Sequence, residues 1–248
     1  MRSFVAAVQF LTVVPIRKAY EADEIGRGAV WFPVVGLLIG LAAAAVYGLT
    51  EAYLFPRLVA QVLGIVALAA ASGGFHLDGL ADSADGMLSA RPRERALEIM
   101  RDSRIGTMGT LALLTVLGLK SGALVTLSHE ATLHALILAP VAGRCMLVLG
   151  LARQPYARPE GGLASVFLVH RRVWQGWWAL LFLVAVAATL FGWAGLAIGL
   201  AVWVVTLAFN AYCRRRIGGI TGDTLGAACE LAELTVLLAA SAALRGTP

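Results

Sequence analysis

Residues Val173–Cys213 read VWQGWWALLFLVAVAATLFGWAGLAIGLAVWVVTLAFNAYC, and this run contains no Asp, Glu, Lys or Arg. A helix crosses the hydrocarbon core of a bilayer, about 30 Å thick, with about 20 apolar residues. The run is therefore long enough for two membrane spans, and we place the turn between them near Gly192. It predicts an all-α, polytopic membrane bundle.

Apolar runs of suitable length recur along the chain, at Val30–Leu49, Leu58–Phe75, Thr107–Leu127, Thr132–Leu151 and Leu225–Leu244. Together with 173–213 they predict about seven transmembrane helices in a single domain over residues 1–248. Only 14% of the residues are charged and 59% are hydrophobic, whereas soluble domains carry roughly a quarter charged residues. The composition thus excludes a water-soluble enzyme.

Two smaller features complete this picture. Phe4–Ile16 is apolar but too short to span and has no small-residue cleavage site after it, so we expect an interfacial or re-entrant helix rather than a signal peptide. The three cysteines, Cys145, Cys213 and Cys229, lie in apolar stretches. We interpret them as reduced packing residues.

The basic residues predict an orientation. If the N-terminus is cytoplasmic, the arginines and lysine of segments 2–27, 91–104, 153–172 and 214–216 are cytoplasmic as well. Only Arg57 and Arg245 then lie in loops on the other side. This asymmetry follows the positive-inside rule. No basic patch is interleaved with exposed aromatic residues, so a nucleic-acid partner is not expected.

The most acidic stretch is residues 73–86, GGFHLDGLADSADG. Asp78, Asp82 and Asp85 stand at positions i, i+4 and i+7, which a helix would place on one face. Because like charges at this spacing repel, the cluster favours a cation such as Mg²⁺, which takes oxygen ligands from carboxylates and substrate phosphates. A solvated helix end is the alternative, but the stretch emerges from an apolar run and lacks interspersed lysines.

Several other charged residues are candidates for the same site. Arg101 and Arg104 flank Asp102, and a row of arginines beside a metal-binding cluster is typical of sites for phosphate-bearing substrates. Lys120 and Arg144 interrupt apolar spans, where an ionisable residue is by default a functional candidate. Pairing of either with Glu230 or Glu233, for structural reasons only, is the alternative.

Near the C-terminus, residues 218–226 read GGITGDTLG. A glycine-rich loop that opens a helix offers backbone N–H groups to a phosphate. Gly222 and Asp223 are therefore candidate substrate-binding residues, and Asp223 is also a candidate metal ligand.

At these residues the sequence resembles the cobalamin synthase family. The resemblance is strongest at 73–86 and continues through LEIMRDSRIG (97–106) and TGDTLGA (221–227). It also includes FLTVVP (10–15), GRG (26–28) and WFPVVG (31–36), so it covers essentially the whole chain. It implies an integral membrane enzyme that uses Mg²⁺ to join adenosylcobinamide-GDP to α-ribazole or its phosphate, with release of GMP.

The implied reaction suggests roles for the acidic residues. Asp78 and Asp82 are expected to hold Mg²⁺ on the diphosphate, and Asp223 to complete the site as a further metal ligand. Asp85, the third carboxylate of the face, is expected to contribute to the metal site and to orient or deprotonate the attacking hydroxyl.

The remaining candidates are expected to bind substrate. Arg101, Arg104 and Lys120 would stabilise charge on the departing GMP, with Asp102 and the Gly222 loop beside them. His76 either binds phosphate or hydrogen-bonds a neighbouring carboxylate. The expected location is the inner (cytoplasmic) membrane with the site facing the cytoplasm, and an oligomer is compatible with the sequence.

Two other functions fit parts of the pattern. Asp78-Gly79-Leu80-Ala81 resembles the start of the CDP-alcohol phosphatidyltransferase motif, but Asp82 stands where that motif has Arg. A secondary transporter would use the charges inside the spans, but the two halves of the chain show no self-similarity of the kind transporters often have.

Overall fold

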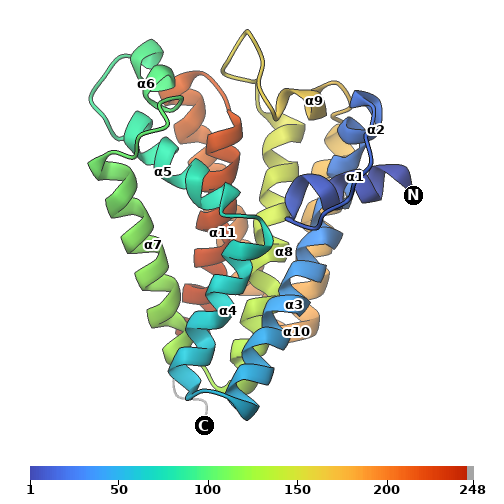
Figure 1. Cartoon of the computed structure of the whole chain (residues 1–248), viewed down its shortest axis with the longest axis vertical. Coiled ribbons are helices and arrows are strands. Elements are labelled where there is room, and N and C mark those ends of the chain that lie inside the picture. Colours follow the sequence, from blue (N-terminus) through green and yellow to red (C-terminus); the bar gives the residue numbers. More distant parts are fainter. Residues whose placement is uncertain (245–248) are drawn as a thin grey trace.

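The computed structural model describes residues 1–244 and shows a bundle of long helices (Figure 1). Within this range the only pairing of extended backbone is one isolated bridge between Tyr156 and Ile220. The elements are α1 (Arg2–Leu11), α2 (Ala22–Gly26), η1 (Arg27–Trp31), α3 (Phe32–Tyr53), α4 (Arg57–Ala71), α5 (Phe75–Met87), α6 (Arg93–Ile99), α7 (Thr107–Val125), α8 (His129–Arg153), α9 (Ser165–Leu168), α10 (Val173–Ile217) and α11 (Gly222–Ala243). The all-α membrane bundle is confirmed.

Five helical stretches in residues 1–244 are long and apolar enough to cross a membrane. They are Ala22–Tyr53, which ends with α3, and the helices α7, α8, α10 and α11. A sixth is gained if α4 and α5, bent by 85° relative to each other, form one broken span. The predicted run Leu58–Phe75 is helical only to Ala71, because Gly73 and Gly74 both adopt positive φ and turn the chain. The count of about seven and the N-terminal orientation stay predictions.

Helix α10 folds back on itself at the predicted position. Gly192 has φ 57° and ψ −133°, outside the helical region. A Cβ on Gly195 would overlap the carbonyl oxygen of Ala187, although two residues eight apart in one continuous helix lie about 12 Å from each other. The two halves of α10 therefore pack against each other, and both of its ends lie at the same end of the bundle.

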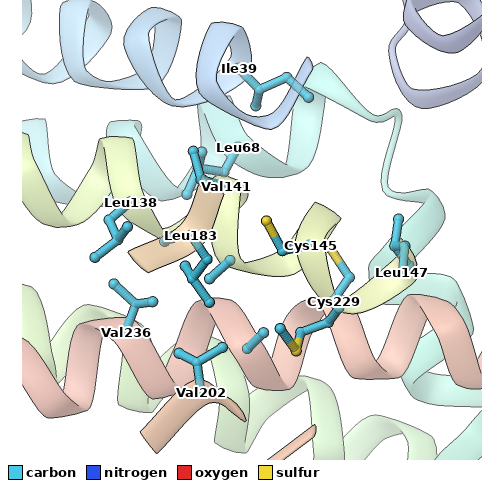
Figure 2. Close-up of a cluster of buried hydrophobic side chains, with 14 of the residues drawn as sticks. Ile39, Leu68, Leu138, Val141, Cys145, Leu147, Leu183, Val202, Cys229 and Val236 are labelled. Atoms are coloured by element: carbon cyan, nitrogen blue, oxygen red, sulfur yellow. The ribbon is translucent and has the colours of Figure 1, made fainter. Parts of the chain in front are cut away.

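Helix α8 lies at the centre of the bundle and packs against α3, α10 and α11. Its side chains from Ala135 to Leu151 form the middle of the main hydrophobic cluster, which Figure 2 shows around Val141 and Cys145. All three cysteines are buried and unpaired, as predicted. A short N-terminal helix is also present, as α1, but it ends at Leu11 rather than Ile16, and its interfacial or re-entrant placement stays a prediction.

Helices α3 and α8 approach each other closely because α3 presents glycines at the contact. A Cβ on Gly40 would lie 2.5 Å from the carbonyl oxygen of Ile137, and one on Gly36 would lie 2.5 Å from that of Pro140. Such small-residue contacts bring membrane helices together without a hydrophobic driving force.

We therefore expect Gly40→Ala to destabilise the protein by about 1–3 kcal/mol, the usual cost of overpacking. Gly48→Ala is the matched control on the same helix, since its Cβ would meet only the Leu133 side chain at 3.7 Å. The control should be neutral or stabilising, because alanine is the better helix former. Thermal unfolding midpoints in detergent test both, and an equal midpoint for the two variants would contradict this account.

The arginine-rich loops meet at one end of the bundle, next to α6 and α9 in Figure 1. Arg216 donates to the carbonyls of Ser89 and Arg91, both at 2.7 Å, and Arg93 donates to that of Ile217 at 2.7 Å. At the opposite end, Arg57 pairs with Glu51, whereas Arg245 lies outside the described residues. The basic segments 91–104, 153–172 and 214–216, which are predicted to lie on one side of the membrane, thus lie at one end of the bundle.

Candidate functional site

The acidic stretch forms a helix, which is the condition under which its spacing places three carboxylates on one face. Helix α5 begins at Phe75, directly after the turn at Gly73 and Gly74, and continues to Met87. The spacing of Asp78, Asp82 and Asp85 on this helix puts the three carboxylates on one face. The sharp turn separates the acidic face from the apolar helix α4, so α5 is free to take a different direction.

A glycine contact brings a fourth carboxylate to this face. A Cβ on Gly79 would lie 2.7 Å from the backbone oxygen of Asp223, so α5 and the start of α11 approach backbone to backbone. As a result the negative charges of Asp78, Asp223 and Asp85 all act on the carboxyl group of Asp82. The four aspartates predicted as metal ligands are therefore close enough for their charges to interact, while their role as metal ligands stays a prediction.

A pocket of about 480 Å³ opens beside the acidic face of α5, and we call it the acidic pocket. Its lining consists of Gly73, Gly74, Phe75, Leu77, Asp78, Ala81, Asp82, Ser103, Ile105 and Leu113. Asp78 is exposed and Asp82 is half-buried. Among residues 1–244, neither carboxylate has a hydrogen-bond or ion-pair partner, so both are available to a ligand in the pocket.

The other two carboxylates have partners in the protein. Asp85 accepts hydrogen bonds from the backbone N–H groups of Gly106 at 2.7 Å and Gly109 at 2.8 Å. It thereby ties α5 to the N-terminus of α7, where a negative charge is favourable. Oδ2 of Asp223 accepts a bond from Arg158 at 2.9 Å and one from the Thr221 hydroxyl at 3.3 Å, which leaves Oδ1 open.

This arrangement determines what kind of metal site is possible. No group of three or more His, Cys, Asp and Glu side chains in the described chain is arranged to hold a metal ion by itself. Mg²⁺, however, usually takes one or two carboxylates and completes its shell with water and substrate phosphates. Asp78 and Asp82 fit such a partial site, because both are open to the same pocket.

The predicted substrate-binding loop forms a wall of the acidic pocket, but its charges are paired elsewhere. Ser103 and Ile105 line the pocket, whereas Arg101 pairs with Glu160. Arg104 donates to both oxygens of Asp102, at 3.0 and 2.7 Å, and lowers the pKa of that exposed carboxyl to about 2. Arg101 and Arg104 thus stand near the pocket in exposed ion pairs that a phosphate has to replace.

The structure does not bring His76 and Lys120 to the acidic pocket. The ammonium group of Lys120 is buried and donates to Glu230 and Glu233, both at 2.7 Å. His76 is buried as well, with Nδ1 at 3.3 Å from a guanidinium nitrogen of Arg144, which in turn bonds Glu233. The alternative given by the sequence, in which Lys120 and Arg144 pair with Glu230 or Glu233 inside the bundle, is therefore the arrangement observed.

The glycine-rich loop lies beside the site. Gly222 is the first residue of α11, and a Cβ there would meet nothing within 4 Å. Sequence reasoning missed Arg158, which holds Asp223 from a loop that is itself fixed by the Tyr156–Ile220 bridge. The only signal in the sequence is its place among the arginines of segment 153–172, which indicate a membrane orientation rather than a ligand site.

Comparison with known proteins finds similarity over nearly the full length of this chain. A family model described as Cobalamin-5-phosphate synthase matches residues 3–241. Proteins named adenosylcobinamide-GDP ribazoletransferase include one from Desulforamulus reducens, 43% identical over 93% of this chain and 92% of its own. One from Roseiflexus is 44% identical over 93% of this chain and 86% of its own. One from Klebsiella pneumoniae is 43% identical over 96% of this chain and 99% of its own. No solved structure matches.

Proposed function

This chain belongs to the cobalamin-5-phosphate synthase family, and we propose that the transfer for which its relatives are named takes place in the acidic pocket. The protein is a multi-pass membrane transferase of cobalamin synthesis. Its substrates are adenosylcobinamide-GDP and α-ribazole or α-ribazole phosphate. The family match favours this activity over a CDP-alcohol phosphatidyltransferase or a transporter.

The reaction sets the demands on the site. A hydroxyl oxygen of α-ribazole bonds to the phosphorus next to cobinamide, the bond from that phosphorus to the bridging oxygen breaks, and GMP leaves with the bonding electron pair. The hydroxyl proton passes to a base or to solvent. In such phosphoryl transfers, catalysis is mainly positioning and stabilisation of charge on the phosphate oxygens.

The observation that carries the proposal is the pair of open carboxylates at one pocket. Asp78 and Asp82 would hold Mg²⁺ there, and Asp223, one of whose carboxylate oxygens has no partner among the described residues, would stand beside this pair. When bound, the ion supplies positive charge to the phosphate oxygens. Arg101 and Arg104 lie on the loop that carries Ser103 and Ile105, and once released from Glu160 and Asp102 their guanidinium groups would stabilise charge on the departing GMP.

Asp85 has a positioning task in this proposal rather than that of a base. Both of its oxygens accept backbone N–H bonds, which fix the start of α7 against α5. The loop of residues 100–106 leads into that point, so Asp85 determines how this wall of the acidic pocket faces Asp78 and Asp82.

We further propose that the protein lies in the inner (cytoplasmic) membrane with the acidic pocket facing the cytoplasm. The pocket lies next to the loop 100–106, at the arginine-rich end of the bundle. That end is cytoplasmic by the positive-inside rule. Nucleotide-linked substrates would then reach the pocket from the cytoplasm.

A direct assay tests the proposal. The purified protein in detergent should release GMP from adenosylcobinamide-GDP only when α-ribazole is present, and chelation of Mg²⁺ should stop the release. Added Mg²⁺ should restore it. GMP formation without an acceptor would indicate hydrolysis, and full activity after chelation would refute the metal assignment. Because detergent leaves no two compartments, transport cannot produce the signal.

A further inference from the structure

A second cavity adjoins the acidic pocket and has a different chemistry. It measures about 540 Å³ and we call it the aromatic groove. Its lining consists of Ala6, Gln9, Phe10, Lys18, Ala19, Tyr20, Ile25, Ser72, Phe75 and Leu163. Phe75 lines both cavities, so a ligand that crosses this ring reaches from the groove to the pocket that contains Asp78 and Asp82.

The groove is built in advance of any ligand. Phe10 packs edge-on against Phe75, with ring centroids 6.0 Å apart, and stacks on the buried Phe32 on its other side. Nε2 of Gln9 donates to the backbone oxygens of Ile16 at 2.9 Å and Lys18 at 3.3 Å, which fixes the segment that carries Lys18 and Tyr20. Such preorganisation lowers the cost of binding.

The groove offers large aromatic surfaces and few hydrogen-bonding groups. The Gln9 amide nitrogen donates to backbone oxygens, and the Ser72 hydroxyl donates to the Ala69 carbonyl at 3.2 Å. Among the described residues, the Lys18 ammonium forms no hydrogen bond or ion pair. It lies 5.6 Å from the centroid of the Tyr20 ring. The available chemistry is therefore an aromatic slot with one cationic donor at its rim.

We propose that the aromatic groove binds the flat base of the acceptor nucleoside, an inference that rests on the proposed function. The base of α-ribazole is a benzimidazole, which is apolar except for one ring nitrogen that accepts a hydrogen bond. Lys18 matches this acceptor, and the aromatic side chains match the faces of the ring. The ribose then crosses Phe75 and brings its hydroxyl to the acidic pocket.

The other aromatic base of the reaction fits less well. Guanine carries several N–H donors on its edge, whereas the side-chain acceptors of the groove are the separate Gln9 amide and Ser72 and Tyr20 hydroxyl oxygens, with no carboxylate that could accept from two neighbouring donors at once. Buried donors without partners cost binding free energy. The corrin ring with its amide side chains is larger than the groove. The donor substrate is therefore assigned to the acidic pocket and the open space above it.

Kinetics separate the two substrates. Tyr20→Leu and Lys18→Met, at residues that line the groove but not the acidic pocket, should each raise the KM for α-ribazole about tenfold, as expected for the loss of one aromatic or charge-assisted contact, and leave the KM for adenosylcobinamide-GDP within about twofold. Arg17→Met is the matched control, because Arg17 is exposed and does not line the groove. A higher KM for adenosylcobinamide-GDP alone would assign the groove to the donor and overturn the proposal.

A labelling experiment gives a readout that does not need turnover. All three native cysteines are buried, so Ala19→Cys places one accessible thiol in the groove, with Ala90→Cys as the exposed control away from it. α-Ribazole should slow maleimide labelling of Ala19→Cys but not of Ala90→Cys, and GMP should slow neither. Equal labelling with and without α-ribazole would refute the groove assignment even if the wild type releases GMP normally, whereas a wild type without transfer activity would refute the proposed function.

Discussion

Replacement of Asp82 with Asn is expected to lower turnover about 100- to 1000-fold, the range seen when one group of a preorganised charged site is removed. The change keeps the size of the side chain and removes the charge that the proposed Mg²⁺ site requires. Asp82 has no partner among the described residues, so the substitution breaks no hydrogen bond or ion pair of the fold.

The same variant is expected to be at least as stable as the wild type. Asp82 is half-buried, and the charges of Asp78, Asp223 and Asp85 all repel its carboxylate. A neutral amide removes this repulsion, which is how active-site carboxylates commonly lower stability in exchange for function. Activity should thus fall while the thermal midpoint stays equal or rises.

The control is Glu94→Gln, the same change of carboxylate to amide on the exposed surface of α6. It should leave both turnover and the thermal midpoint unchanged. GMP release at saturating Mg²⁺ and thermal unfolding in detergent measure the two quantities. Wild-type turnover of Asp82→Asn under these conditions would refute the metal assignment. A lower thermal midpoint would show that Asp82 has a structural role instead.

Much of the fold could be predicted because membrane helices are encoded locally. The uncharged run 173–213 exceeds the length of one span, and Gly192 is where the chain leaves helical geometry. The bend between α4 and α5 was harder to predict. The apolar run Leu58–Phe75 predicts one continuous span, whereas the positive φ values of Gly73 and Gly74 turn the chain by 85° into a second helix. Hydropathy carries no information about that direction.

The candidate site shows the same division between local and long-range information. Asp78, Asp82 and Asp85 share a face because of their spacing, which sequence reveals directly. Arg158 and Asp223 meet only because distant segments fold together, and no spacing rule predicts such a pair. The engagement of Asp85 by backbone N–H groups was equally hidden, because backbone partners leave no trace in residue identity.

Replacement of Glu233 with Gln is expected to have the largest effect on stability, about 3–5 kcal/mol, the cost of leaving buried charges without a partner. Glu233 is buried and accepts bonds from both Lys120 and Arg144. The cluster of Lys120, Arg144, Glu230 and Glu233 is neutral as a whole. Loss of one carboxylate leaves a net positive charge inside the bundle.

A pair of variants separates this charge balance from the mere loss of contacts. Lys120→Met alone leaves Glu230 without its cation, whereas Lys120→Met combined with Glu230→Gln removes one charge of each sign and retains the bond between Arg144 and Glu233. The double variant should therefore unfold at a higher temperature than Lys120→Met alone, although it loses more polar groups. Additive losses would show that the charges do not interact. The expected non-additivity would show that the four residues act as one neutral unit, which lets α7, α8 and α11 carry ionised groups through the apolar core.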